Sequence, residues 1–185
     1  MATLDTATGI ISDRTREMTQ QSVWRAMRPD DLGHVHAIGV HVHPSYPERI
    51  EVYQERLRLY PNGCYVFEIN NEIYGYVISH PWHPMRPPKL DSLVVAMPTF
   101  PATFYIHDLA LLPQARGNGA GAGAVDVLVD HAQAIGLADI SLVAVNNSLP
   151  FWRGQGFETI SDDAITATLS SYDDDAQFMV RTLDI

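Results

Sequence analysis

The stretch from Ile106 to Val125 constrains the fold of this chain more than any other part of the sequence. Its apolar residues 109–111 are typical of the end of a buried strand, and Pro113 then stops strand pairing because proline has no N–H. Residues 116–121, Arg-Gly-Asn-Gly-Ala-Gly, lead into a helix. Glycines let successive N–H groups point into one concavity, where the helix dipole adds positive potential. The stretch therefore predicts a strand, a loop and a helix start that together hold a pyrophosphate.

Three kinds of phosphate loop compete for this stretch. A P-loop requires Gly-Lys-Ser/Thr, and the only lysine of the chain is Lys89, which excludes it. A dinucleotide fingerprint fits poorly, because residues 112–118 separate the strand from its glycines and the acidic Asp139 stands where a strand begins. The third kind is Arg-x-x-Gly-x-Gly, which the chain carries at Arg116, Gly119 and Gly121. A glycine-rich helix start with no ligand stays open as the alternative.

A second block of sequence narrows the choice. Residues 146–158, Asn-Asn-Ser-Leu-Pro-Phe-Trp-Arg-Gly-Gln-Gly-Phe-Glu, follow the apolar strand at 140–145. Together the two blocks resemble the signatures of the GNAT superfamily of N-acetyltransferases, the first block matching its acetyl-CoA loop. The spacing between them leaves room for one helix and one strand, as that family requires. The resemblance covers roughly residues 22–185.

This resemblance implies a mixed α/β fold and a cosubstrate. The expected architecture is a central, mostly antiparallel sheet flanked by helices, with the fourth and fifth strands splayed apart. Acetyl-CoA is expected to lie with its pantetheine arm in that gap, and no metal is expected. The implied cofactor-binding residues are Leu109, Ala110, Leu111, Arg116, Gly117, Asn118, Gly119, Ala120, Gly121, Asn146, Asn147 and Trp152. Simple turn chemistry remains the alternative for the two asparagines.

Hydrophobic periodicity and turn residues predict the elements. Strands are expected at about residues 23–27, 64–69, 72–79, 103–111, 140–145 and 177–183, with one more at Phe157. Helices are expected to begin at Arg28 and break at Pro44, and then to span about 47–59 and 118–135. Asn70-Asn71 is a hairpin turn. Residues 80–102 contain six prolines and form a long loop, either functional or disordered, and residues 161–175 form an acidic loop.

Composition bounds the kind of protein. The 185 residues suit one domain at 22–185, preceded by a mobile tail at 1–21 that is rich in Thr, Ser and Asp. No apolar run is long enough for a bilayer and no signal peptide is visible, and with Cys64 as the only cysteine a cytoplasmic location is expected. The net charge of −10 argues against nucleic acid and favours cationic small molecules. A monomer or a homodimer is expected.

His107 is the candidate catalytic base. An alkylamine is mostly protonated at neutral pH, so its acetylation needs a base, often acting through water. Among arylalkylamine (serotonin-type) N-acetyltransferases a histidine occupies this place, nine residues before the motif arginine, here Arg116. Their second histidine is replaced here by Tyr105, the other candidate catalytic residue. Strand alternation predicts that Tyr105, His107 and Leu109 share one face, and that Asp108 lies on the other. The alternative is that His107 is a structural histidine in the core, with its hydrogen bonds made to neighbouring protein groups.

Trp152 departs from the serotonin-type pattern, which has a tyrosine at this position as the acid for the leaving thiolate. An indole N–H is a hydrogen-bond donor but not a useful acid. Trp152 is therefore expected to form an apolar wall beside the CoA arm. Tyr105 or Tyr172 could replace the missing acid, or the thiolate could leave unassisted.

Histidines and aromatic residues elsewhere invite further hypotheses. The cluster of His34, His36, His41 and His43 suggests zinc, but residues two apart on a helix do not face the same way, so surface histidines are favoured over a metal site. Loops flanking the expected acceptor pocket carry Tyr46, His80, Trp82 and His83, which could hold an amine by cation–π contact or simply pack.

The sequence therefore predicts an acetyl-CoA-dependent N-acetyltransferase acting on a primary amine. A small (aryl)alkylamine or a polyamine-like substrate is favoured by the acidic chain and the serotonin-type pattern. A peptide or protein amine, and a CoA-binding sensor without turnover, remain the alternatives.

Overall fold

The structure of the protein is a computed structural model, which describes residues 21–162, 165, 168–169, 172 and 175–184. The predicted tail at 1–21 lies outside the described residues except for Gln21, and the predicted 161–175 loop is described only in part. Within the described residues, one seven-stranded sheet has the order β1-β2-β3-β4-β5-β7-β6. Its strands are β1 (Ser22–Ala26), β2 (Cys64–Ile69), β3 (Glu72–Trp82), β4 (Thr103–Leu111), β5 (Asp139–Ala144), β6 (Glu158–Thr159) and β7 (Gln177–Thr182).

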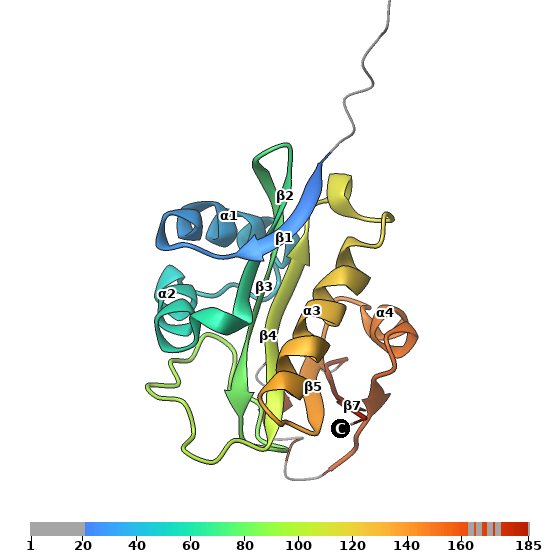
Figure 1. Cartoon of the computed structure of the whole chain (residues 1–185). Coiled ribbons are helices and arrows are strands. Elements are labelled where there is room, and N and C mark those ends of the chain that lie inside the picture. Colours follow the sequence, from blue (N-terminus) through green and yellow to red (C-terminus); the bar gives the residue numbers. More distant parts are fainter. Residues whose placement is uncertain (1–20, 163–164, 166–167, 170–171, 173–174, 185) are drawn as a thin grey trace, which may run out of the picture.

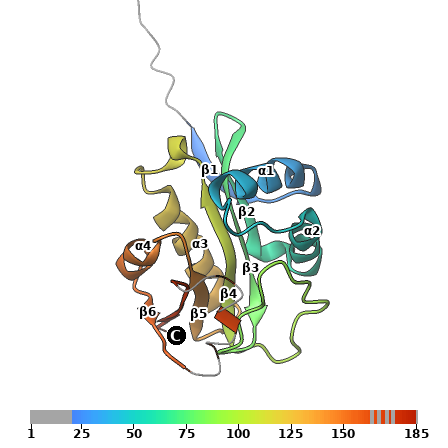
Figure 2. The ribbon, with the colours of Figure 1, turned by 180° about the vertical axis from the view of Figure 1, so that it is seen from behind.

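Helices cover both faces of the sheet (Figures 1 and 2). On one face lie α1 (Leu32–Val42) and α2 (Ile50–Leu59), and on the other lie α3 (Ala120–Ala134) and α4 (Leu149–Gly154). Three short 3-10 helices are η1 (Pro29–Asp31), η2 (Pro61–Gly63) and η3 (Pro113–Ala115). Each face has its own core: Leu128 of α3 packs with Phe104 of the sheet on one face, and Val35 of α1 packs with Tyr76 of the sheet on the other. No helix among the described residues is long and apolar enough to cross a membrane.

Local chemistry accounts for most element boundaries. The Asn70-Asn71 turn is confirmed, since both residues have positive φ values of 52° and 68°, as a tight hairpin turn requires. The helix α2 begins at Ile50 rather than at the predicted residue 47. The strand β3 runs three residues beyond its predicted end at 79, because residues 80–82 pair with β4 even though residue 81 is a proline.

The expected splay between the fourth and fifth strands is present. The two strands β4 and β5 run parallel and pair over three positions, Phe104–Ile140, Tyr105–Ser141 and Ile106–Leu142. Beyond these pairs β5 continues against β7 up to residue 144, so β5 follows β7 and diverges from β4. A gap therefore opens at the carboxyl ends of the two strands.

A β-bulge in β4 changes which side chains face the gap. Ile78 of β3 pairs with Asp108 and the next residue, Ser79, pairs with Ile106, which leaves His107 as an extra residue. Ile106 packs into the core under α3, whereas His107 bonds to Glu48 and Asp108 bonds to the Tyr76 hydroxyl on the α1/α2 face. The prediction that His107 and Asp108 lie on opposite faces is therefore wrong, because the bulge interrupts the alternation on which it relied.

The loop predicted at residues 80–102 is an ordered strap along α2 after β3 ends. We call residues 83–102 the strap; both ribbon views show it beside α2 (Figures 1 and 2). The Glu55 carboxylate accepts the backbone N–H groups of Val94 and Val95 at 2.8 and 3.0 Å. The buried guanidinium of Arg56 donates to the Ser92 carbonyl at 2.9 Å. These contacts hold the strap against the rim of the gap.

Candidate active site

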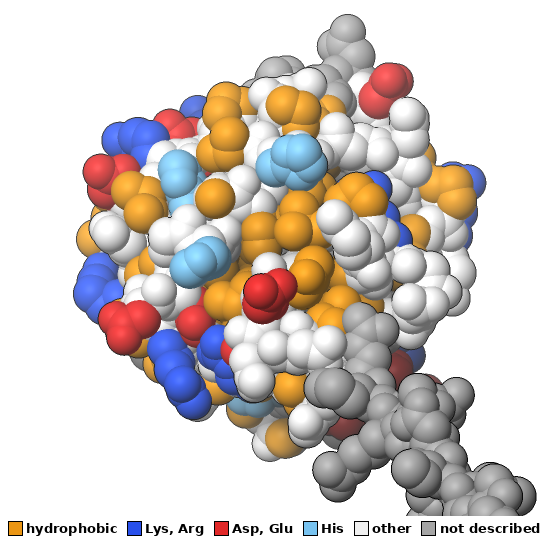
Figure 3. All heavy atoms as spheres, turned by 90° about the horizontal axis from the view of Figure 1, so that it is seen from above, with side chains coloured by type: hydrophobic (Ala, Val, Ile, Leu, Met, Phe, Trp, Pro, Cys, Tyr) orange, Lys and Arg blue, Asp and Glu red, His pale blue; other side chains and the backbone are white. Residues whose placement is uncertain are grey.

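A cavity of about 810 Å³ occupies the gap between β4 and β5. It reaches from the start of α3 to the segment between α1 and α2, so one space joins the expected cofactor loop to the expected acceptor side. Seen from above, hydrophobic side chains gather in the middle of this face, with histidine and acidic side chains beside them (Figure 3). A cavity of this size suits a pantetheine arm together with a small acceptor.

The glycine-rich loop shapes the cofactor end of the cavity. Gly117 and Gly119 have φ values of 82° and 79°, a left-handed conformation that favours glycine. The N-cap of α3 is Gly119, which has no side chain to cap the first N–H groups of the helix, and residues 119–122 line the cavity. Trp24 fixes this helix start, because its indole N–H donates to the Ala120 carbonyl at 2.9 Å. The end of the cavity is therefore suited to a pyrophosphate.

The structure brings most of the predicted cofactor residues together. The residues of that set that line the cavity are Leu109, Leu111, Arg116, Gly117, Gly119, Ala120, Gly121, Asn146 and Trp152. Ala110, Asn118 and Asn147 do not line it; the Ala110 side chain packs instead into the core under α1 and α2. Of the two asparagines, Asn146 is therefore the one placed at the cofactor gap.

Aromatic side chains from α4 form the wall opposite the strap. The Trp152 ring is 6% exposed and packs edge-on against Phe151 and Phe157, with ring centroids 4.9 and 5.3 Å away. Phe151 closes over the start of α3, where a Cβ added to Gly121 would lie 3.0 Å from its ring. The predicted role of Trp152 as an apolar wall agrees with this packing.

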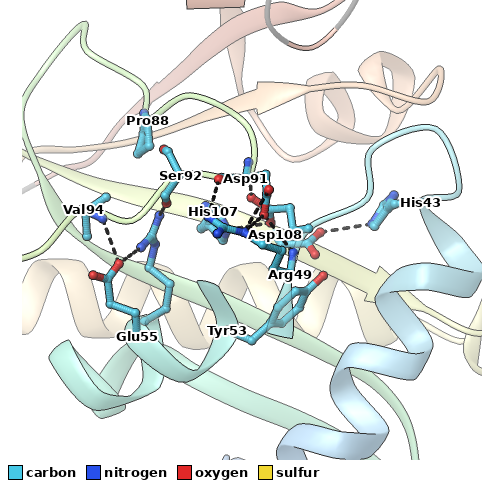
Figure 4. Close-up of polar contacts among 12 residues, drawn as sticks. His43, Arg49, Tyr53, Glu55, Pro88, Asp91, Ser92, Val94, His107 and Asp108 are labelled. Carbon is cyan, nitrogen blue, oxygen red and sulfur yellow. Dashed lines mark hydrogen bonds and ion pairs between the residues drawn. The ribbon is translucent and has the colours of Figure 1, made fainter. Parts of the chain in front are cut away.

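His107, which Figure 4 labels, forms a buried pair with Glu48 on the acceptor side. The His107 Nε2 lies 2.9 Å from Glu48 Oε2, and the two side chains are 3% and 6% exposed. The other carboxylate oxygen of Glu48 accepts the Asp91 N–H at 3.0 Å, so the strap fixes this carboxylate. Because a carboxylate only accepts hydrogen bonds, the neutral imidazole carries its proton on Nε2 and Nδ1 is the basic atom. That Nδ1 is buried, and no protein group among the described residues bonds to it.

His43 and Asp108 form a second histidine–carboxylate pair in the same cavity (Figure 4). The His43 Nε2 lies 3.1 Å from Asp108 Oδ1, at ion-pair distance but without the alignment of a hydrogen bond. Burial tends to raise the pKa of Asp108, but His43 and the Tyr76 hydroxyl together lower it. Burial likewise tends to lower the pKa of His43, but Asp108 and the Leu109 carbonyl raise it above its ordinary value.

Sequence reasoning missed Glu48 and the role of His43. Glu48 follows Pro47 in the segment between the first two predicted helices, and His43 precedes Pro44. The signal that could have found them is their position in a proline-bounded break of a helical region. Such breaks are loops between elements, and binding and catalytic residues are found on loops more often than elsewhere.

Tyr105 and Tyr172 line the cavity, and their hydroxyl groups are hydrogen-bonded to each other. Tyr105 is 1% exposed, and burial raises its pKa well above the ordinary value. Burial also raises the pKa of Tyr172, whose hydroxyl donates to the Pro88 carbonyl of the strap at 2.9 Å. Both phenols are therefore weaker acids than a free tyrosine.

The other predicted acceptor residues divide into two groups. Tyr46 lines the cavity, whereas His80, Trp82 and His83 do not. His80 is buried behind the site with its ring centroid 6.4 Å from that of His107, and burial lowers its pKa to about 3, so it is neutral. Within the part of the chain that the structure describes, no three His, Cys, Asp or Glu side chains gather as a metal site.

Solved structures share this fold at low sequence identity. Ard1 from Thermoplasma volcanium superposes with a TM-score of 0.68 at 13% identity, covering 89% of this chain and 99% of that one. Naa50 of Arabidopsis thaliana, in complex with the bisubstrate analogue CoA-Ac-MVNAL, gives 0.62 at 14% identity over 86% of this chain and 97% of that one. N-acetylglutamate synthase from Neisseria gonorrhoeae, with coenzyme A and N-acetyl-glutamate, gives 0.65 at 19% identity, covering 89% of this chain and 36% of that one.

The sequence comparisons agree with the fold. No curated protein matches the chain. The model of the acetyltransferase (GNAT) family matches residues 37–157, which include both the glycine-rich loop and the segment after β5. Because this match spans well over half of the chain, the protein belongs to the acetyltransferase (GNAT) family and is an acetyltransferase that uses CoA.

Proposed function

We propose that the protein transfers the acetyl group of acetyl-CoA to the primary amine of a small (aryl)alkylamine or a polyamine-like substrate. The observation that carries this proposal is the charge of the acceptor side. Two carboxylates, Glu48 and Asp108, line it together with aromatic and apolar side chains. Among the described residues that line the cavity, Arg116 is the one Lys or Arg, and it lies at the cofactor end. Such a site attracts a cationic amine and disfavours an acceptor that bears a carboxylate.

The strap favours a small acceptor over a long peptide. Leu90 of the strap lines the cavity, and the Pro88 carbonyl accepts the hydroxyl of Tyr172 from the opposite side. These contacts place the strap directly beside the acceptor end of the cavity, where it narrows the space for a bulky acceptor. The structure of Naa50 holds the bisubstrate analogue CoA-Ac-MVNAL, and a peptide acceptor remains the alternative that the experiment below distinguishes.

In the proposed reaction, His107 removes a proton from the ammonium group, directly or through one water. Glu48 accepts a hydrogen bond from the Nε2–H of His107 and, as a carboxylate, stabilises the imidazolium that forms. The neutral amine attacks the thioester carbonyl, a C–N bond forms, and the C–S bond breaks to release the CoA thiolate. The position of His107, nine residues before Arg116, supports this role through the serotonin-type resemblance, whereas Tyr105 and Trp152 depart from that pattern.

An amine panel tests the proposal. Thiol release from acetyl-CoA would be measured with arylalkylamines, polyamines, free amino acids and short peptides at equal concentration. We expect the highest kcat/KM with arylalkylamines or polyamines, and at least a tenfold lower value for a free amino acid than for the matched amine that lacks its carboxylate. A preference for amino acids or peptides would contradict the proposal. Tight CoA binding without thiol release from any amine would point instead to a CoA sensor.

Replacing Trp152 tests its assignment as a wall. Trp152→Phe should keep most of the activity, with kcat within a few-fold of wild type, because a phenyl ring preserves the packing against Phe151 and Phe157. Steady-state kinetics with the best amine of the panel, together with the acetyl-CoA affinity, would check this. A collapse of kcat with intact CoA binding would show that the indole N–H takes part in the chemistry.

A further inference from the structure

The leaving thiolate has no acid at the position where the serotonin-type pattern supplies one. That position holds Trp152, whose indole N–H is not an acid near neutral pH. Tyr105 and Tyr172 line the cavity, but burial raises the pKa of each, so neither phenol gives up its proton readily. His107 is paired with Glu48 and serves the amine. The proton for the sulfur must therefore come from another group or from solvent.

We propose that His43 is the catalytic acid that protonates the CoA thiolate as the acetyl group leaves. This inference rests on the proposed acetyl transfer. His43 caps the carboxyl end of α1 and lines the cavity between the two diverging strands. Its Nε2 lies 3.1 Å from Asp108 on β4, and its Nδ1 lies 2.8 Å from the Asn146 amide nitrogen after β5. The imidazole thus bridges the gap that the pantetheine arm is expected to enter.

The surroundings of His43 raise the pKa of its imidazolium form. The groups that face it are Asp108 and the Leu109 carbonyl on β4, Glu48 between the helices, and Asn146 after β5. The two carboxylates and the carbonyl outweigh burial, and the pKa of His43 is raised. Asp108 is itself held as a carboxylate by the Tyr76 hydroxyl and His43. An acid of this kind operates near neutral pH, where general acid catalysis is efficient.

Asn146 can support both protonation states of His43. An amide group offers an oxygen acceptor and an NH₂ donor, and rotation by half a turn exchanges them. The imidazolium Nδ1–H can donate to the amide oxygen, and the neutral imidazole can accept from the amide nitrogen after the proton has gone. The Nε2 atom is buried 3.1 Å from Asp108, which attracts the imidazolium, so the proton that passes to the sulfur is the one on Nδ1.

The proton balance of the reaction is consistent with two histidines. The ammonium form of the amine loses two protons on its way to the amide, and His107 passes these to solvent. The electron pair of the C–S bond goes to sulfur, and His43 gives one proton to the thiolate. Solvent then protonates His43 again. The net result is one proton released for each acetyl group transferred, with CoA leaving as the thiol.

The pKa of the CoA thiol in the binary complex tests the proposal without any amine. An imidazolium beside the sulfur stabilises the thiolate, so the thiol of CoA bound to the wild-type protein should ionise at lower pH than free CoA. This can be followed through the ultraviolet absorbance of the thiolate. His43→Gln should return the thiol pKa to the value of free CoA, and the control His41→Gln, at an exposed histidine outside the cavity lining, should leave it unchanged.

The pH dependence of kcat provides the second readout, measured with the best amine of the panel. His43→Gln should lower kcat by about 10²-fold with little change in the KM for acetyl-CoA, and it should remove the fall of kcat at high pH, because an acid must be protonated to act. Asp108→Asn should shift that fall to lower pH, because Asp108 raises the pKa of His43.

Two results would contradict the assignment of His43 as the acid. The proposal is overturned if His43→Gln leaves the thiol pKa of bound CoA at its wild-type value, or if it keeps the wild-type kcat and its alkaline limb. The thiol titration needs no acceptor, so it gives the same answer when the amine assignment fails. A lowered thiol pKa in the wild type that returns to the free value in His43→Gln, together with no acetylation of any amine, would contradict the proposed function alone.

Discussion

His107→Ala is expected to lower kcat/KM by roughly 10²–10⁴-fold, the range attributed to general acid–base catalysis. The buried Glu48 bonds to Nε2 at 2.9 Å, which leaves Nδ1 to accept the proton of the amine. The deficit should shrink as the pH rises, because more of the amine then arrives already deprotonated. Measurements of kcat/KM between pH about 6 and about 9 with one amine check both the size and the trend.

Two further variants sharpen this test. Glu48→Gln keeps the shape of the side chain but removes the charge that stabilises the imidazolium, so we expect a smaller loss than for His107→Ala. The control His34→Ala changes an exposed histidine on α1 and should leave kcat/KM unchanged. If the deficit of His107→Ala is the same at both ends of the pH range, His107 is a positioning residue rather than the base. In that case the amine would lose its proton to water held elsewhere in the cavity.

Valine in the glycine-rich loop is expected to weaken acetyl-CoA binding about tenfold or more. At Gly119 a side chain would have open space, but the φ of 79° is strained for any residue with a Cβ, by roughly 1–2 kcal/mol. At Gly121 the backbone is helical, but the added Cβ would lie 3.0 Å from the Phe151 ring and push this wall toward the cofactor. Both changes disturb the N–H groups that face the expected pyrophosphate. The KM and the dissociation constant for acetyl-CoA measure the effect.

Gly123→Ala is the matched control for this prediction. Its Cβ would lie 3.7 Å from the Trp24 ring, an ordinary van der Waals contact, and Gly123 does not line the cavity. Alanine also favours a helix interior, so this variant should bind acetyl-CoA as the wild type does. Unchanged acetyl-CoA affinity in folded Gly119→Val and Gly121→Val proteins would refute the assignment of the loop to the pyrophosphate.

Elements whose boundaries depend on local chemistry could be predicted from the sequence. The strand β4 spans Thr103–Leu111 as expected, because Pro101 and Pro113 bracket an apolar run. The Asn70-Asn71 turn and the start of α3 at Gly119 also follow from residues that tolerate positive φ. The glycine-rich loop at residues 116–121 belongs to this class, since its glycines act through the backbone within a few residues of one another.

The geometry of the catalytic groups was decided by the tertiary structure. The bulge at His107 depends on the register between β3 and β4, and a shift of one residue in a strand moves side chains to the other face. Glu48 reaches His107 from 59 positions earlier in the chain, and Asn146 reaches His43 across 103 positions. No local pattern encodes such distances, because they arise from how α1, α2 and the strap pack on the sheet. The sequence by itself thus determined the fold family and the position of the glycine-rich loop, whereas long-range packing alone decided which carboxylate pairs with which histidine.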